Sequence, residues 1–129
     1  MNVKSVTPKT LKSWLDAGEA MVIDVRELRE YESGHIEGST LIPLNSLHPA
    51  ALPDSNGRKL VMLCRVGNRS MFACMKLNGA VSAEIYNLDG GIRGWMMEGL
   101  PVHKPEQASG AEDGAPLAAK FMRFMTRFS

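Results

Sequence analysis

One short apolar run constrains the fold of this 129-residue chain more than any other feature. Residues 60–63, Leu-Val-Met-Leu, follow one another without a polar interruption, and Cys64 ends the run. A run that is apolar at every position is typical of a strand buried on both faces of a parallel sheet. We therefore predict a strand over residues 59–64.

Strand-like and helix-like segments alternate along the chain. Thr7 followed by Pro8 is a favourable helix start, because threonine caps free amides and proline is tolerated at the first helical position. The alternation predicts an α/β fold with a parallel sheet covered by helices on both faces. The predicted strands span residues 20–25, 40–43, 59–64 and 83–88, and the predicted helices span residues 8–17, 27–33, 70–78 and 92–98.

Met71, Phe72 and Met75 are the apolar residues that we expect to face inward from the helix over residues 70–78, with Cys74 as a further candidate. We interpret most of the nine methionines as core-packing residues rather than as a soft-metal site.

The bulk composition excludes some classes of protein. Fifteen basic and fourteen acidic residues leave a net charge of +1, whereas nucleic-acid-binding domains usually carry a strong basic excess. The start of the sequence has no apolar stretch of signal-peptide length, and no run approaches the roughly 18 apolar residues of a transmembrane helix. Two cysteines fit a reducing compartment better than a disulfide framework. We expect a cytoplasmic protein with no nucleic-acid partner.

The loop that follows the strongest strand carries the chemistry. Cys64 is delivered to a short loop, residues 65–69, that leads directly into a helix. Backbone amides of such a loop and the positive end of the helix dipole favour thiolate over thiol, and cysteines in such settings have pKa values of about 3.5–7.5. Arg65 and Arg69 add positive charge, and Gly67 permits a backbone turn. The sequence therefore predicts a reactive thiolate in an anion-binding cradle.

Two other interpretations of this loop remain. Taken alone, a cysteine at the end of an apolar strand is more often a small buried hydrophobe, and it is the two nearby arginines and the glycine that shift the balance toward function.

A cradled thiolate can also attack a phosphate ester. Four residues separate Cys64 from Arg69, one fewer than in cysteine-dependent phosphatases. A shorter loop encloses a smaller volume, which favours one added sulfur atom over a phosphoryl group.

Together with other motifs, this loop makes the sequence resemble a rhodanese domain over roughly residues 3–103. Four ordered signatures carry the resemblance: Asp24 to Glu27 with Glu30-Tyr31 and Gly34 to Leu44; Cys64 to Ser70; Asn87 to Trp95; and Gly99 to Val102. The resemblance implies a rhodanese-like sheet of about five parallel strands flanked by helices on both faces, and a persulfide mechanism.

The resemblance also implies roles for the loop residues. Cys64 is expected to carry sulfur, taking it from a small anionic donor such as thiosulfate or a persulfide and giving it to a thiol or cyanide acceptor. No metal or organic cofactor is required. A non-catalytic rhodanese-like regulatory module is the alternative, and a cysteine phosphatase is the weaker one. The residues expected to bind the donor are Arg65, Val66, Gly67, Asn68, Arg69 and Ser70.

Other polar residues are interpreted structurally. Asp24 and Arg26 are expected to pair at a strand end and hold neighbouring loops. His35 is expected to stabilise a turn rather than to act as a base for Cys64. Residues 89–91, Asp-Gly-Gly, are predicted to form a turn near the site. Cys74 is interpreted as a buried helix cysteine, with a resolving cysteine as the alternative.

The chain is predicted to divide into a domain over residues 1–103 and a C-terminal segment over residues 104–129. The segment begins as a Gly-, Ala-, Pro- and Glu-rich linker and ends in a short amphipathic helix from Pro116. This helix is expected to pack on its own domain, to pair with a second copy in a homodimer, or to attach weakly to an anionic membrane surface. Its apolar stripe comprises Leu117, Phe121, Phe124, Met125 and Phe128.

Overall fold

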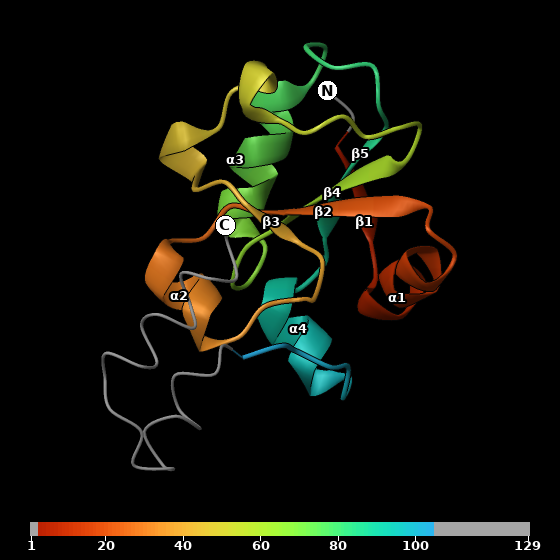
Figure 1. Ribbon diagram of the computed structural model, residues 1–129, viewed down its shortest axis with the longest axis vertical. Helices are drawn as coiled ribbons and strands as arrows, with labels where there is room; N and C mark the ends of the chain where they lie inside the picture. The colour runs from red at the N-terminus through yellow and green to blue at the C-terminus, as the bar shows by residue number, and fades with distance from the viewer. Residues whose placement is uncertain (1–2, 105–129) are drawn as a thin grey trace, which may run out of the picture.

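The structure, a computed structural model, describes residues 3–104. The predicted linker and amphipathic helix lie outside these residues. Within them, five strands form one sheet in the order β1-β5-β4-β2-β3, and every neighbouring pair is parallel (Figure 1). This confirms the predicted parallel α/β fold. The strands are β1 (Lys4–Val6), β2 (Ala20–Asp24), β3 (Thr40–Leu41), β4 (Lys59–Leu63) and β5 (Ile85–Leu88).

Helices cover both faces of the sheet. In Figure 1, α3 lies against one face, whereas α1 and α4 lie on the other. The first helix begins as predicted, because the Thr7 side chain accepts a hydrogen bond from the backbone N–H of Thr10 and Pro8 opens the helix. The helices are α1 (Pro8–Asp16), α2 (Leu28–Ser33), α3 (Asn68–Leu77) and α4 (Gly91–Met97), with 3₁₀ turns at Leu44–Ser46 and Pro49–Ala51.

The two faces of β4 supply two separate hydrophobic cores. Leu60, Met62 and Cys64 point into the core beneath α3, whereas Val61 and Leu63 point into the core beneath α1 and α4. Each fully buried side chain of this kind stabilises the fold by roughly 1.5–3 kcal/mol. Burial on both faces explains why this strand lacks the alternation of polar and apolar residues.

The first strand has no counterpart among the strands predicted from the sequence. Lys4–Val6 has one buried residue, Val6, and pairs only with β5 at the sheet edge. Three residues with one apolar side chain give no periodic signal. The four predicted strands are also shorter than expected: β2 and β4 each end one residue early, β3 ends at Leu41, and β5 begins at Ile85.

The inward face of α3 differs from the prediction. Met71, Phe72 and Met75 are exposed, with 63% of the Phe72 surface accessible. The buried residues of this helix recur at intervals of three, one and three, which is the spacing of a single helix face. Ser70, on this buried face, contacts the sulfur of Cys64. Small side chains then face the sheet, and the large ones turn outward. The buried residues of α3 are Ser70, Ala73, Cys74 and Leu77.

Candidate active site

Cys64 lies directly after β4, at the carboxyl end of the sheet, where a parallel α/β fold binds its ligands. The loop from Cys64 to Gly67 leads into α3, which begins at Asn68. Gly67 adopts a positive φ of 111°, a conformation that side-chain-bearing residues rarely adopt, so a glycine is needed at this turn. Cys64 is 1% exposed, so it is a buried residue beneath the loop.

The sulfur of Cys64 is surrounded by hydrogen-bond donors. The backbone N–H of Gly67 donates to Sγ at 3.1 Å, and the hydroxyl of Ser70 lies 3.3 Å from it. Burial raises the pKa of the Cys64 thiol, but hydrogen bonds from the Ser70 hydroxyl and from the backbone amides of Ser70, Gly67 and Val66 outweigh it and lower the pKa below its ordinary value. The hydrogen bonds therefore shift the ionisation of Cys64 in the direction that the sequence predicts.

The start of α4 holds the outer side of the loop. The backbone N–H of Ile92 donates to the carbonyl of Cys64 at 2.8 Å, and the N–H of Arg93 donates to the carbonyl of Arg65 at 3.0 Å. These two bonds hold the Cys64 and Arg65 peptides against the start of α4. Gly91 permits the close approach, because a Cβ atom there would lie 2.4 Å from the Arg65 carbonyl oxygen. The predicted turn over residues 89–91 is therefore a direct support of the loop.

The side chain of Arg69 is held in an ion pair. Its two terminal nitrogens donate to the two carboxylate oxygens of Glu30, each at 2.7 Å, in a bidentate ion pair that joins α3 to α2. The hydrogen bond from Arg69 holds the pKa of Glu30 down at about 2. By contrast, Arg65 is exposed and has no carboxylate within salt-bridge distance among residues 3–104. Within residues 3–104, Arg65 is therefore a positive charge next to Cys64 that no carboxylate pairs with.

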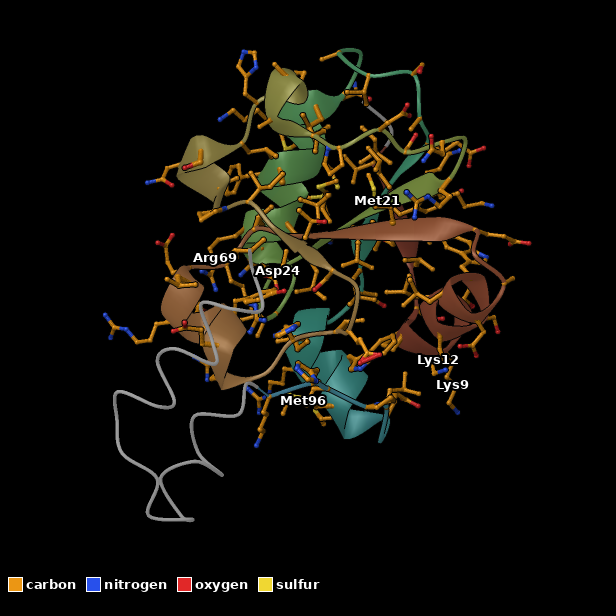
Figure 2. All side chains as sticks on the ribbon, in the orientation of Figure 1. Lys9, Lys12, Met21, Asp24, Arg69 and Met96 are labelled. Atoms are coloured by element: carbon orange, nitrogen blue, oxygen red, sulfur yellow. The ribbon has the colours of Figure 1, made fainter. Side chains whose placement is uncertain are left out.

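Asp24 and Arg26 form the structural pair that the sequence predicts. Both are buried, and Arg26 donates to both carboxylate oxygens of Asp24, with the shortest contact at 2.7 Å. The same guanidinium donates to the carbonyls of Glu30, within α2, and of Gly34, at its C-terminal end, so it ties the end of β2 to α2. Figure 2 shows Asp24 and Arg69 at the same end of the sheet. The pair thus positions α2, which in turn supplies Glu30 to Arg69.

His35 also has the structural role that was predicted. Its ring stacks on Tyr31 at a centroid distance of 3.8 Å, and its Nδ1 lies 3.1 Å from the carbonyl oxygen of Tyr31. Its backbone pairs with that of His103, which anchors the last described residues of the chain to the domain. His35 makes no hydrogen bond to Cys64, so the loop itself supplies the stabilisation of the thiolate.

Cys74 is buried on α3, in agreement with its interpretation as a buried helix cysteine. Burial raises its pKa to about 12, so this thiol stays protonated under conditions in which Cys64 ionises. It lines a cavity of about 180 Å³ together with Val3, Asn78 and Ile85, at the amino end of β5 and away from the loop.

No group of three or more His, Cys, Asp or Glu residues within 3–104 is placed to hold a metal ion. Within the same range, no helix has the length and apolarity needed to cross a membrane.

Sequence reasoning gave no role to Asn87, which the structure places beside the loop. Its side chain is buried on β5, accepts a hydrogen bond from the hydroxyl of Ser70 and donates one to the carbonyl of Gly67 at 3.3 Å. The available signal was a polar amide inside an apolar strand, which a buried position tolerates only when the amide is hydrogen-bonded.

Comparisons with known proteins agree with this geometry. The chain matches the Rhodanese-like domain family over residues 7–98. The thiosulfate sulfurtransferase GlpE of Ectopseudomonas mendocina is 31% identical over 110 residues, which cover 85% of this chain and 96% of GlpE. An uncharacterized protein of Synechocystis sp. is 35% identical over 104 residues, which cover 81% of this chain and 58% of that protein.

A solved structure shows the same fold. The rhodanese-related protein of Thermoplasma volcanium superposes with a TM-score of 0.69 and 31% sequence identity, covering 78% of this chain and 97% of that one. The chain therefore belongs to the Rhodanese-like domain family, and sulfurtransferases are among its relatives.

Proposed function

We propose that this protein is a sulfurtransferase that carries sulfane sulfur as a persulfide on Cys64. The observation that carries the proposal is the position of the Cys64 sulfur, which accepts the Gly67 N–H at 3.1 Å inside a loop whose amides lower its pKa. The donor is thiosulfate or a persulfide, and the acceptor is a thiol or cyanide. The two free cysteines support a reducing compartment, which we take to be the cytoplasm.

In the first half of the reaction, the Cys64 thiolate attacks the outer sulfur of thiosulfate. A new S–S bond forms, the S–S bond of thiosulfate breaks, and its electron pair leaves with sulfite. The product is an anionic persulfide on Cys64. In the second half, cyanide or a thiolate attacks the outer sulfur, and the electron pair of the Cys64–sulfur bond returns to Cys64 as thiolate. Neither half needs an external oxidant or reductant.

The loop residues 65–70 contribute to both halves. Their amides stabilise negative charge on the sulfur before and after transfer, as an oxyanion hole does for oxygen. Arg65 attracts the anionic donor from the exposed rim of the loop, while Arg69, paired with Glu30, holds the start of α3 in place. Val66, Gly67, Asn68 and Ser70 complete the cradle.

Intact-mass spectrometry after incubation with thiosulfate tests this proposal. The protein should gain the mass of one sulfur atom, and peptide mapping should place that atom on Cys64. Added cyanide should remove the sulfur and release thiocyanate. Cys64→Ser is the control and should gain nothing.

A parallel assay with aryl phosphates tests the phosphatase alternative. If phosphate release depended on Cys64 and no sulfur were gained, the site would be a phosphatase and the loop-size argument would be wrong. If neither reaction occurred, the fold would serve a non-catalytic role.

A further inference from the structure

Asn87 is an interior polar residue in a central strand. β5 lies between β1 and β4, where Asn87 stands opposite Ser5 on one side and Met62 on the other. The residue is 5% exposed. An unpaired amide in this position would cost roughly 1–3 kcal/mol, whereas both ends of this one are hydrogen-bonded.

The orientation of the Asn87 amide follows from its two partners. The carbonyl of Gly67 can only accept a hydrogen bond, so the NH₂ group of Asn87 must face it, at 3.3 Å. The carbonyl oxygen Oδ1 then faces Ser70 and can only accept. Asn87 is therefore a fixed acceptor for the Ser70 hydroxyl.

Ser70 has one hydroxyl proton and two acceptors that compete for it. One acceptor is Oδ1 of Asn87, and the other is the sulfur of Cys64 at 3.3 Å when it is ionised. In the thiol form, the S–H of Cys64 can donate to Ser70 while Ser70 donates to Asn87. In the thiolate form, the hydroxyl must turn toward the sulfur, and Oδ1 loses its donor.

These contacts close a ring around the base of the loop. The ring runs from the sulfur of Cys64 to Ser70, from Ser70 to Asn87, from Asn87 to the carbonyl of Gly67, and from the N–H of Gly67 back to the sulfur. Every member is satisfied in the thiol form. Ionisation of Cys64 strengthens the Gly67 bond but breaks the bond between Ser70 and Asn87.

We propose that Asn87 is a positioning residue that draws the Ser70 hydroxyl away from the sulfur and so restrains the ionisation of Cys64. The loop amides favour the thiolate, and Asn87 opposes them through Ser70. The balance matters for sulfur transfer because a thiolate loses nucleophilicity as its pKa falls, and the best attacking thiol has a pKa near the ambient pH. The inference deepens the proposed function and rests on it for its catalytic meaning, while ionisation of Cys64 is measurable without any turnover.

The other groups around Cys64 act independently of Asn87. Arg69 and Cys74 on α3 interact electrostatically with the sulfur, and Arg69 is held by Glu30 of α2. Arg65 directly follows Cys64 in the loop. Arg93, at the start of α4, is hydrogen-bonded to that loop through its backbone N–H. None of these groups is hydrogen-bonded to Asn87, so a change at Asn87 removes only its two hydrogen bonds in the ring.

The test measures the apparent pKa of Cys64 from the pH dependence of its alkylation by iodoacetamide, followed on the Cys64 peptide so that Cys74 does not interfere. Asn87→Leu should lower this pKa by about half to one unit, the worth of one hydrogen bond of about 1 kcal/mol. Ser70→Ala should raise it. In the Ser70→Ala background, Asn87→Leu should no longer lower it.

Asn45→Leu is the matched control at an exposed asparagine and should leave the Cys64 pKa unchanged. If Asn87→Leu raised the pKa equally with and without Ser70, Asn87 would only brace the loop through Gly67, and the proposal would be wrong. Asn87→Val, which suits a strand, replaces the leucine variant if that one does not fold.

A second measurement uses the unaltered protein. The side-chain amide resonances of Asn87 should titrate with the same apparent pKa as the alkylation of Cys64, because Oδ1 loses its donor on ionisation. The titration should disappear in Ser70→Ala. Amide resonances that do not change across the ionisation of Cys64 would overturn the proposal.

Discussion

The carboxylate of Glu30 and the guanidinium of Arg69 are joined by two hydrogen bonds of 2.7 Å, although the residues are 39 positions apart in the sequence. The pair links α2 to the helix that follows the cysteine loop. It also means that the positive charge of Arg69 is compensated where it stands. Predictions about stability in acid and about donor binding both follow from this pair.

Glu30 should contribute to stability in a defined range of pH. Its pKa is about 2 in the folded protein against an ordinary value of 4.5, so the contribution is fully present above about pH 4.5 and is lost as the pH falls toward 2. Urea denaturation at pH 7 and at pH 3 should show a smaller loss of unfolding free energy on acidification for Glu30→Gln than for the unaltered protein. Equal losses would show that the ion pair does not shift this carboxyl.

Donor binding should depend on the charges at the rim. Arg65→Ala should raise the apparent KM for thiosulfate roughly two- to fivefold, and added salt should weaken binding in the unaltered protein. Arg69→Ala should also raise KM, because it leaves the Glu30 carboxylate uncompensated near the donor. The double variant Arg69→Ala/Glu30→Gln should recover part of that loss. An unchanged KM in both single variants would show that backbone amides alone bind the donor.

The two cysteines should differ sharply. Cys64→Ser should abolish transfer of sulfur from thiosulfate to cyanide while leaving the fold intact, since a hydroxyl of similar size replaces the thiol. Cys74→Ser should keep most of the activity, because that thiol is buried, protonated and outside the loop. Thiocyanate formation measures both. Substantial turnover by Cys64→Ser would contradict the assignment of the nucleophile.

Gly91 should be essential for the support of the loop. A Cβ atom there meets the Arg65 carbonyl at 2.4 Å, and the residue has a φ of +61°. Gly91→Ala should therefore cost about 3 kcal/mol of unfolding free energy and most of the activity. Gly79→Ala is the matched control, because Gly79 also has a positive φ, +81°, but open space around it. It should cost about 1–2 kcal/mol and leave turnover intact. Equal effects would mean that strain alone matters at both positions.

A chain ending at Lys104 should remain an active domain. Residues 3–104 contain the whole sheet, both cores and the pairing of His35 with His103. We expect the truncation to change the association state or the solubility more than kcat, as light scattering and a sulfur-transfer assay would show. Failure of the truncated chain to fold would place the C-terminal segment in the core and move the domain boundary.

The sequence by itself determined the parallel α/β fold, the cysteine at the end of the strongest strand and the pairing of Asp24 with Arg26, whereas the role of His35 followed from the family resemblance. These features rest on local signals: an apolar run, a glycine in a tight turn, and charged residues at a strand end. The same reasoning missed β1, because three residues at a sheet edge carry no periodicity. It also placed Met71, Phe72 and Met75 inside, because hydrophobicity alone does not fix the rotation of a helix.

Only the tertiary structure decided which partners the site residues meet. The side of α3 that carries Ser70 faces Cys64, the pairing with Glu30 compensates the charge of Arg69, and the ring through Asn87 joins segments 17 or more residues apart. Such contacts depend on how strands and helices far apart in the chain are brought together. The sequence therefore predicted Cys64 as the reactive group, and the packing around this residue decided the charges and the hydrogen bonds that surround it.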